Sequence, residues 1–293
     1  MTKIALYGQK LLKKDLPYIT YFIKYTEERN MEVYIEKKFF KKIKSYKRFK
    51  YLENPIFSFN TKINKDFEYI FTFGGDGTIL SCITFNLGIP IVGINTGNLG
   101  FLSTFNKIEF LKKLDHILEH KFQPIARSLL WVETNDSTFS KKQFALNEIS
   151  VLRKENTSMI TIDAYIEGEF LTSYWGDGLI ISTPTGSTGY SLSCGGPIIS
   201  PENKNFVLTP IAPHNLFSRP LIIPYDQKIR LKVHSRAYVY SICLDARINF
   251  LHKNTELLIK KAPFNVYIIA EKNYYNTIRE KLLWGADKRN YRY

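Results

Sequence analysis

The chain has 293 residues, of which 44% are hydrophobic and 15% aromatic, and its formal net charge is +14. This length is enough for one large domain or two ordinary ones, and the aromatic content argues against extensive disorder. No run approaches the roughly 18 apolar residues needed to cross a bilayer, and the first residues lack the apolar core and cleavage site of a signal peptide. We therefore expect a cytoplasmic protein with no membrane partner.

The positive charge permits two functional explanations, which are nucleic-acid binding and attraction of phosphorylated substrates. The densest basic run, Lys37 to Lys50, interleaves its cations with apolar residues such as Phe39, Phe40 and Ile43. This spacing is typical of an amphipathic helix. We expect a solvated helix face here and no nucleic-acid partner.

Cysteine and histidine form no recognisable pattern. Cys82, Cys194 and Cys243 lie far apart, without the paired spacing of a zinc site or the even count of a disulfide framework. The five histidines are scattered along the chain. The sequence therefore predicts reduced cysteines and no metal ion held by protein ligands alone.

The first ~105 residues alternate strand and helix signals, which predicts an α/β domain with a parallel sheet. Asn106 can cap one of these helices, with Glu109 three residues on in a capping-box arrangement. The expected strands cover residues 3–7, 31–35, 68–73 and 89–94, and the expected helices cover residues 15–29, 78–87 and 106–120.

After Phe122 strands dominate. Ile160 to Ile166 alternates apolar and polar residues, and Glu167-Gly168 then predicts a hairpin turn. Further strands are expected at residues 229–233, 257–259 and 266–269. We expect an antiparallel, β-sandwich-like domain, followed by a basic helical segment that returns to the first domain. The predicted divisions are residues 1–121, 122–270 and 271–293.

The segment Gly74-Gly75-Asp76-Gly77 joins a strand end to a helix start. Open α/β sheets bind ligands at this edge, glycines let a phosphate approach the backbone closely, and a helix N-terminus offers N–H donors. The carboxylate of Asp76 could accept a proton from an attacking hydroxyl in phosphoryl transfer. A tight turn with a capping aspartate is the alternative, since neither Gly-x-Gly-x-x-Gly nor a Walker A loop is present.

Two further segments carry polar groups suited to a nucleotide. Thr183 to Ser193 is rich in hydroxyls and glycines and has no charge, so it offers hydrogen bonds to sugars and phosphates, with Tyr190 as a stacking surface. By composition alone it could be an ordinary Ser/Gly loop. The pair Asn147-Glu148 is weak by itself, because such pairs are common on surfaces.

In their order and approximate spacing, these segments resemble the NAD kinase family over nearly the whole chain. Gly-Gly-Asp-Gly alone is shared with lipid kinases and phosphofructokinases, whereas the Thr-Pro-Thr-Gly-Ser-Thr string is much more particular. The resemblance rests on residues 74–77, 147–148, 177–193, 195–198, 210–214, 219–220, 245 and 282–285.

The resemblance implies a kinase that transfers the γ-phosphoryl group of ATP to the 2′-hydroxyl of the adenosine ribose of NAD, with a divalent cation, Mg²⁺, on the ATP phosphates. Family members are usually homodimers or homotetramers. Their catalytic carboxylate matches Asp76. The matching substrate-binding residues are Gly74, Gly75, Gly77, Asn147, Glu148, Asp177, Thr188, Gly189, Tyr190, Ser191, Leu192, Ser193, Ala212 and Asp245.

The chain departs from the family pattern at three places. Gly189 replaces an alanine, and Asp245-Ala246-Arg247 replaces Asp-Gly-Gln, so that Arg247 could reach a phosphate or a carboxylate. Trp175 stands where some relatives have a basic residue, so a charge contact there is lost or is replaced by Arg153 or Lys154.

Three alternatives remain at this point. A diacylglycerol-type lipid kinase would share the Gly-Gly-Asp-Gly segment. A dinucleotide sensor would have lost the catalytic carboxylate, which is present at Asp76. A nucleic-acid-binding protein driven by charge would bind oligonucleotides with a steep salt dependence.

Overall fold

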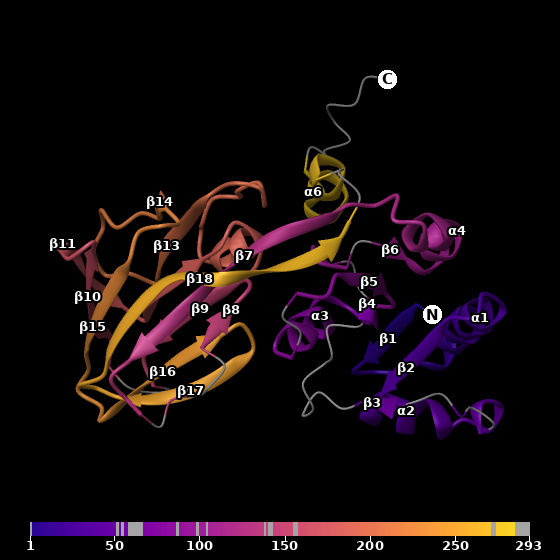
Figure 1. Ribbon diagram of the computed structural model, residues 1–293. Coiled ribbons are helices and arrows are strands. Elements are labelled where there is room, and N and C mark those ends of the chain that lie inside the picture. The colour runs from indigo at the N-terminus through magenta and orange to yellow at the C-terminus, as the bar shows by residue number, and fades with distance from the viewer. Residues whose placement is uncertain are drawn as a thin grey trace, which may run out of the picture. The chain divides into compact units, whose positions relative to one another are not determined.

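The computed structural model describes residues 2–50, 53, 56–57, 67–85, 88–97, 100–103, 105–137, 139, 143–154, 158–270 and 274–284. The chain forms two compact units, one of Met1–Ala126 with Val266–Tyr293 and one of Arg127–Asn265. The first unit is α/β with parallel strands and the second is built from antiparallel strands, which confirms the predicted fold class (Figure 1). Within the described residues, no helix has the length and apolarity that a membrane span requires.

The first unit contains a parallel sheet with β1 at its centre. Strands β1, β4 and β5 are mostly apolar and buried, as expected for strands that are covered on both faces. The last residues of β18 add to this sheet beside β5, and β6 pairs with the far end of β5. The strands are β1 (Lys3–Gly8), β2 (Glu32–Glu36), β3 (Ile56–Phe57), β4 (Phe67–Phe73), β5 (Ile91–Asn95), β6 (Phe105–Asn106) and the end of β18 (Glu256–Ile269).

Helices cover both faces of this sheet. Phe22 of α1 and Phe110 of α4 pack against each other and against Phe71 of β4. On the other face, Ile79 of α3 lies against Gly93 of β5. The helical elements are η1 (Lys13–Asp15), α1 (Leu16–Glu28), α2 (Lys37–Lys44), η2 (Lys47–Phe49), α3 (Asp76–Ile83), α4 (Lys107–Leu118) and α6 (Tyr274–Leu282).

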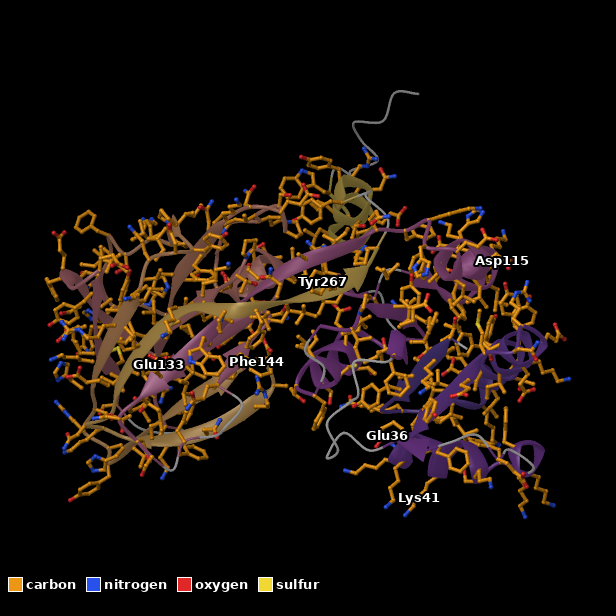
Figure 2. All side chains as sticks on the ribbon, in the orientation of Figure 1. Glu36, Lys41, Asp115, Glu133, Phe144 and Tyr267 are labelled. Carbon is orange, nitrogen blue, oxygen red and sulfur yellow. The ribbon has the colours of Figure 1, made fainter. Side chains whose placement is uncertain are left out.

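Two helix predictions are borne out in detail. Asn106 accepts the N–H groups of Ile108 and Glu109, while Glu109 accepts the N–H of Asn106, so the capping box is formed. The basic run forms an amphipathic α2, whose Phe39, Phe40 and Ile43 are buried. Glu36 caps this helix and Lys41 extends from it on the solvent side (Figure 2).

The second unit is a sandwich of two antiparallel layers around one apolar core. The predicted turn at Glu167-Gly168 joins β10 to β11. One layer contains β7 (Pro124–Thr134), β8 (Phe144–Ala145), β10 (Ile160–Ile166), β11 (Glu169–Gly176), β15 (Ile229–His234) and β18; the other contains β9 (Glu148–Leu152), β12 (Gly178–Ser182), β13 (Asn205–Ile211), β14 (Leu221–Pro224), β16 (Val239–Leu244) and β17 (Arg247–His252).

Some boundaries differ from those expected. The two strands predicted at 257–259 and 266–269 are one strand, β18. Pro263 interrupts the apolar pattern but not the strand, because its fixed φ is compatible with extended backbone. The helix expected at 78–87 already begins at Asp76 and ends at Ile83, and residues 86 and 87 lie outside the described residues.

Candidate functional site

Asp76 is the first residue of α3, and Gly74 and Gly75 separate it from the end of β4. Its carboxylate accepts the backbone N–H groups of three successive residues. The N–H of Phe101 lies 2.6 Å from Oδ2, and those of Leu102 and Ser103 each lie 3.0 Å from Oδ1. The Ser103 hydroxyl adds a fourth contact, at 3.2 Å from Oδ1. Asp76 therefore fixes the segment 101–103 beside the Gly-Gly-Asp-Gly turn.

The glycines around Asp76 have different physical roles. A side chain at Gly74 would place its Cβ 2.1 Å from Thr78 Oγ1, and one at Gly100 would place it 2.0 Å from Asp76 Oδ1. Those two glycines make room for close packing within the turn. Among the described residues, no atom lies within 4 Å of the Cβ position at Gly75 or Gly77, so these residues leave open space over the start of α3. This open space is where a phosphate could approach the backbone.

A cation that sequence reasoning did not assign lies in the same unit. The ammonium of Lys281, on α6, lies 5.0 Å from the centre of the Phe101 ring. Burial lowers the pKa of Lys281, and the charges of Asp76 and Glu280 oppose that shift. No motif points to this lysine, because only the fold brings α6 to the segment that Asp76 holds.

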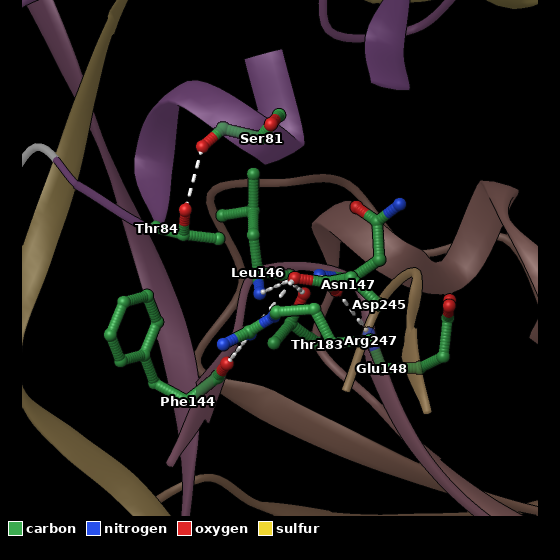
Figure 3. Close-up of polar contacts among 9 residues, drawn as sticks. All are labelled: Ser81, Thr84, Phe144, Leu146, Asn147, Glu148, Thr183, Asp245 and Arg247. Atoms are coloured by element: carbon green, nitrogen blue, oxygen red, sulfur yellow. Dashed lines mark hydrogen bonds and ion pairs between the residues drawn. The ribbon is translucent and has the colours of Figure 1, made fainter. Parts of the chain in front are cut away.

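In the second unit, Asp245 organises the backbone at Asn147 and Glu148 (Figure 3). Its carboxylate accepts the N–H groups of Leu146, Asn147 and Glu148 at 3.0, 2.7 and 3.3 Å. Asp245 has a φ of +52° at the β16–β17 turn. Aspartate tolerates this left-handed conformation, and no positive φ falls on the following residue, where the family glycine is replaced by alanine.

The start of the Thr183–Ser193 string clamps the same backbone from the other side. Thr183 donates its N–H to the carbonyl of Asn147 at 2.9 Å and its hydroxyl to the carbonyl of Leu146 at 2.6 Å. A Cβ at Gly186 would lie 2.0 Å from the Asn147 carbonyl oxygen. Only glycine permits this approach, which explains the need for glycine at that point of the string.

Two polar atoms of this corner are left for a ligand. Asn147 Oδ1 and Glu148 Oε2 are buried and have no hydrogen-bond partner within the part of the chain that the structure describes. Burial raises the pKa of Glu148 to about 7, with a further contribution from the charge of Asp245. Alanine at 189 would place its methyl 3.0 Å from Glu148 Oε2, so Gly189 leaves that oxygen uncovered.

The rest of the string forms two short helical turns, η3 (Thr185–Thr188) and α5 (Tyr190–Ser193), instead of an open loop. Ser191 is buried and its hydroxyl lies 2.8 Å from that of Thr209. Tyr190 and Ser193 are exposed, while Thr188 and Leu192 are half-buried. The string thus has a buried side that holds the fold and an open side that can meet a ligand.

Asp177 lies at the junction of β11 and β12 and pairs with Arg153, whose Nε is 2.6 Å from Asp177 Oδ1. Arg153 therefore supplies positive charge at this point of the chain. Trp175 instead packs against the His214 ring, with the ring centres 4.3 Å apart and the ring planes tilted by 43°. Ala212 is exposed, with a φ of +42°, directly after β13.

The side chain of Arg247 contacts other residues of the second unit. It donates to the carbonyl of Phe144, and its guanidinium lies 4.0 Å from the Asp245 carboxylate. Burial lowers the pKa of Arg247, and the charge of Asp245 opposes that shift. In this structure its contacts stabilise the corner that Asp245 organises.

The structure thus gathers Asn147, Glu148, Gly189, Asp245 and Arg247 around one corner of the second unit. Burial raises the pKa of the Tyr190 hydroxyl, and the charges of Asp177 and Glu148 are among the smaller causes, so these three side chains share one neighbourhood. Asp76 and the three predicted glycines form a separate group in the first unit. Among the described residues, no three His, Cys, Asp or Glu side chains are grouped to hold a metal ion.

Comparison with known proteins identifies both units. The model of the ATP-NAD kinase N-terminal domain matches residues 10–122, and that of the C-terminal domain matches residues 146–270. The NAD kinase of Christiangramia forsetii is 47% identical, and the alignment covers 98% of this chain and 100% of that protein. The NAD kinase of Flavobacterium psychrophilum is 46% identical with the same coverage.

Solved structures show the same fold. Yeast NADH kinase complexed with NADH has a TM-score of 0.88 at 25% identity, covering 99% of this chain and 90% of that one. An NAD kinase from Archaeoglobus fulgidus in complex with ATP has a TM-score of 0.75 at 24% identity, covering 96% and 99%.

Proposed function

The chain belongs to the NAD kinase family, and we propose that it transfers the γ-phosphoryl group of ATP to the 2′-hydroxyl of the adenosine ribose of NAD, yielding NADP. The observation that carries this proposal in the structure is the corner at Asn147 and Glu148. Asn147 Oδ1 and Glu148 Oε2 are buried there without a hydrogen-bond partner among the described residues. Without a ligand they would destabilise the fold, since a buried polar atom that lacks a hydrogen bond costs free energy. Ribose hydroxyls and adenine amino groups are donors that satisfy such acceptors.

In the proposed reaction Asp76 is the general base. The ribose oxygen forms a bond to the γ-phosphorus while the bond from that phosphorus to the β–γ bridging oxygen breaks, and ADP leaves. The hydroxyl proton passes to Asp76. A carboxylate has about four lone-pair sites, and Oδ2 accepts only the Phe101 N–H within the described residues, so it retains capacity for the hydroxyl.

Binding would divide between the two groups of residues. Gly75 and Gly77 would admit phosphate at the start of α3, where the backbone is open. Asn147, Glu148 and the exposed ring of Tyr190 would hold the adenosine, and Asp177 the other end of the dinucleotide. Asp245, which faces the backbone, would act by positioning Asn147 and Glu148.

Mg²⁺ fits this scheme as a companion of ATP. Mg²⁺ commonly uses substrate phosphates, several waters and one or two carboxylates, so it needs no cluster of protein ligands. When bound, the ion would neutralise charge on the phosphates; positioning and charge neutralisation supply most of the rate in such reactions.

The direct test is incubation of the purified protein with NAD, ATP and Mg²⁺, followed by detection of NADP. Parallel reactions replace NAD by NADH and ATP by polyphosphate, which define the acceptor and the donor. NADH would give NADPH, and absence of both NADP and NADPH under all these conditions would refute the proposal. The lipid-kinase alternative has no support, because the relatives described above are NAD or NADH kinases.

The role of Asp76 is tested by Asp76→Asn. This amide cannot take the hydroxyl proton, so we expect turnover to fall by a factor of about 10² to 10⁴, the usual contribution of a general base. NAD affinity, measured by calorimetry, should stay within about threefold, because Asp76 acts on the transferring proton and not on the bulk of the dinucleotide. Normal turnover in this variant would remove Asp76 from the chemistry.

Two further expectations complete the proposal. We infer a homodimer or homotetramer, as is usual in the family, which sedimentation of the purified protein would check. We also infer a cytoplasmic location, which fractionation of cells would check.

A further inference from the structure

The group of residues around Asp76 includes a cation that the proposed function leaves unused. Lys281 is half-buried, and its ammonium lies over the ring of Phe101, 5.0 Å from the ring centre. The backbone N–H of that same Phe101 donates to Asp76 Oδ2 at 2.6 Å. Two contacts therefore connect Lys281 to the carboxylate, and the charge of Asp76 is the largest of those that favour the protonated ammonium.

Half-buried lysines elsewhere in the chain differ in their partners: Lys44, Lys253 and Lys261, like Lys281, lie over aromatic rings, and others pair with carboxylates. Lys107 pairs with Asp15 at 3.0 Å, and Lys260 pairs with Glu133 at 2.7 Å. Lys281 has no ion pair within 4.0 Å in the described part of the chain, although burial disfavours its charge. An ammonium has three N–H donors, and an aromatic face does not accept them all. This lysine therefore retains donors for an anion.

The anion that suits this place is a phosphate. The start of α3 has open space at Gly75 and Gly77, and helix N-termini bind anions through their N–H groups. Lysine is a common phosphate ligand, acting as a point charge. Phosphoryl transfer also builds negative charge beside the hydroxyl that Asp76 would face, which a nearby cation stabilises.

We propose that Lys281 binds a phosphate group of the nucleotide at the Asp76 site, so that the C-terminal helix α6 supplies part of that site. This inference rests on the proposed function for the identity of the nucleotide. The phosphate could come from ATP or from the pyrophosphate of the dinucleotide, and the two sources are separated by the experiment. The competing explanation is that Lys281 has a purely structural role and only holds α6 against Phe101.

The test measures binding by calorimetry with the full-length protein and three probes: Mg²⁺-ATP, NAD and inorganic tripolyphosphate. The variants are Lys281→Met, Lys281→Gln and Lys281→Arg. Arg279→Met is the matched control, because Arg279 is an exposed cation in the last turn of the same helix. Two neutral variants are used so that the result does not depend on the folding of one.

We expect the neutral variants to bind tripolyphosphate and at least one substrate about tenfold or more weakly, as the loss of a charged hydrogen bond implies. Lys281→Arg should restore affinity to within about threefold, and Arg279→Met should change nothing. A loss for Mg²⁺-ATP alone assigns the donor phosphates, and a loss for NAD alone assigns the pyrophosphate. Unchanged affinity for all three probes would overturn the inference, even if turnover fell, because a purely structural role of Lys281 predicts unchanged affinity.

Conversion of NAD to NADP by the unaltered protein is measured alongside. If it is absent, the proposed function fails, and tripolyphosphate binding still tests Lys281. If it is present while the neutral variants bind all probes normally, only the inference about Lys281 fails.

Discussion

The carboxylate of Asp245 accepts the N–H groups of residues 146 to 148 and thereby sets the direction of Asn147 and Glu148. This arrangement disfavours the charged form of Glu148, whose carboxylate is buried near that of Asp245. Burial and Asp245 together raise the pKa of Glu148 to about 7. Such perturbed groups are often found in functional sites, where a ligand supplies the missing hydrogen bonds.

This pKa shift predicts a pH-dependent stability. Between the unfolded pKa of 4.5 and the folded pKa of about 7, the folded chain holds a proton that the unfolded chain releases. Folding is therefore favoured below this window, and that advantage is lost as the pH rises through it, by about 3 kcal/mol. Glu148→Gln should lack this loss, so its unfolding free energy should exceed that of the unaltered protein more at pH 8 than at pH 4.5. Parallel pH profiles in urea would contradict the assignment; the raised pKa of Asp245 acts in both proteins.

Gly186 offers a second prediction for a single residue. In Gly186→Ala the new Cβ would lie 2.0 Å from the Asn147 carbonyl oxygen, so the backbone must move. We expect a loss of about 1–3 kcal/mol, as for other overpacked sites, measured by urea unfolding. Gly97→Ala is the control, because no atom of the described residues lies within 4 Å of its Cβ position. Equal effects of the two substitutions would contradict this explanation.

Among the elements, those with strong local signals were predictable. The α4 capping box and the amphipathic α2 follow from residues three or four apart, and the structure confirms both. Contacts between distant residues have no such signal. Asp245 meets Asn147 across 98 positions, and α6 meets Phe101 only because the fold brings them together. Motifs therefore indicated which segments matter, while the partners of Asp76, Asp245 and Arg247 had to come from the structure.

The cap of α4 gives a prediction at this scale. Asn106→Ala removes the acceptor for two N–H groups at the start of the helix, so the unfolding free energy should fall by about 1 kcal/mol. Asn106→Asp keeps an oxygen at the same place and should retain most of the stability. Urea denaturation of the three proteins checks this, and an equal loss in both variants would contradict the capping role.

At the scale of the whole molecule, two strands belong to both units. The unit boundaries fall at 126/127, within β7, and at 265/266, within β18. In the second unit these strands lie side by side, with Trp131 against Phe264 and Glu133 paired to Lys260 (Figures 1 and 2). β18 pairs with β5 in the first unit and with β15 and β7 in the second, so its loss would remove a hydrogen-bonded neighbour from strands of each unit.

We therefore expect the units to unfold together. Scanning calorimetry should give a single transition whose calorimetric and van't Hoff enthalpies agree for the cooperative species. The third tryptophan, Trp284, lies in the first unit and is replaced by phenylalanine for this measurement. In the Trp284→Phe variant, fluorescence of Trp131 and Trp175 should change at the same urea concentration as far-UV ellipticity, since both tryptophans lie in the second unit while ellipticity reports on both units. Two resolved transitions would show that the shared strands do not couple the units.

The path of the chain also bears on how one unit is inserted into the other in sequence. Because the polypeptide leaves the α/β unit at Ala126 and re-enters it at Val266, the β-rich unit is inserted in sequence between two segments of the α/β unit. Its entry and exit are neighbouring strands, which is the arrangement that lets one domain be grafted into another without separating the ends of the host. The α/β unit could accept a different inserted domain at the same two points, provided that the two ends of that domain also lie next to each other.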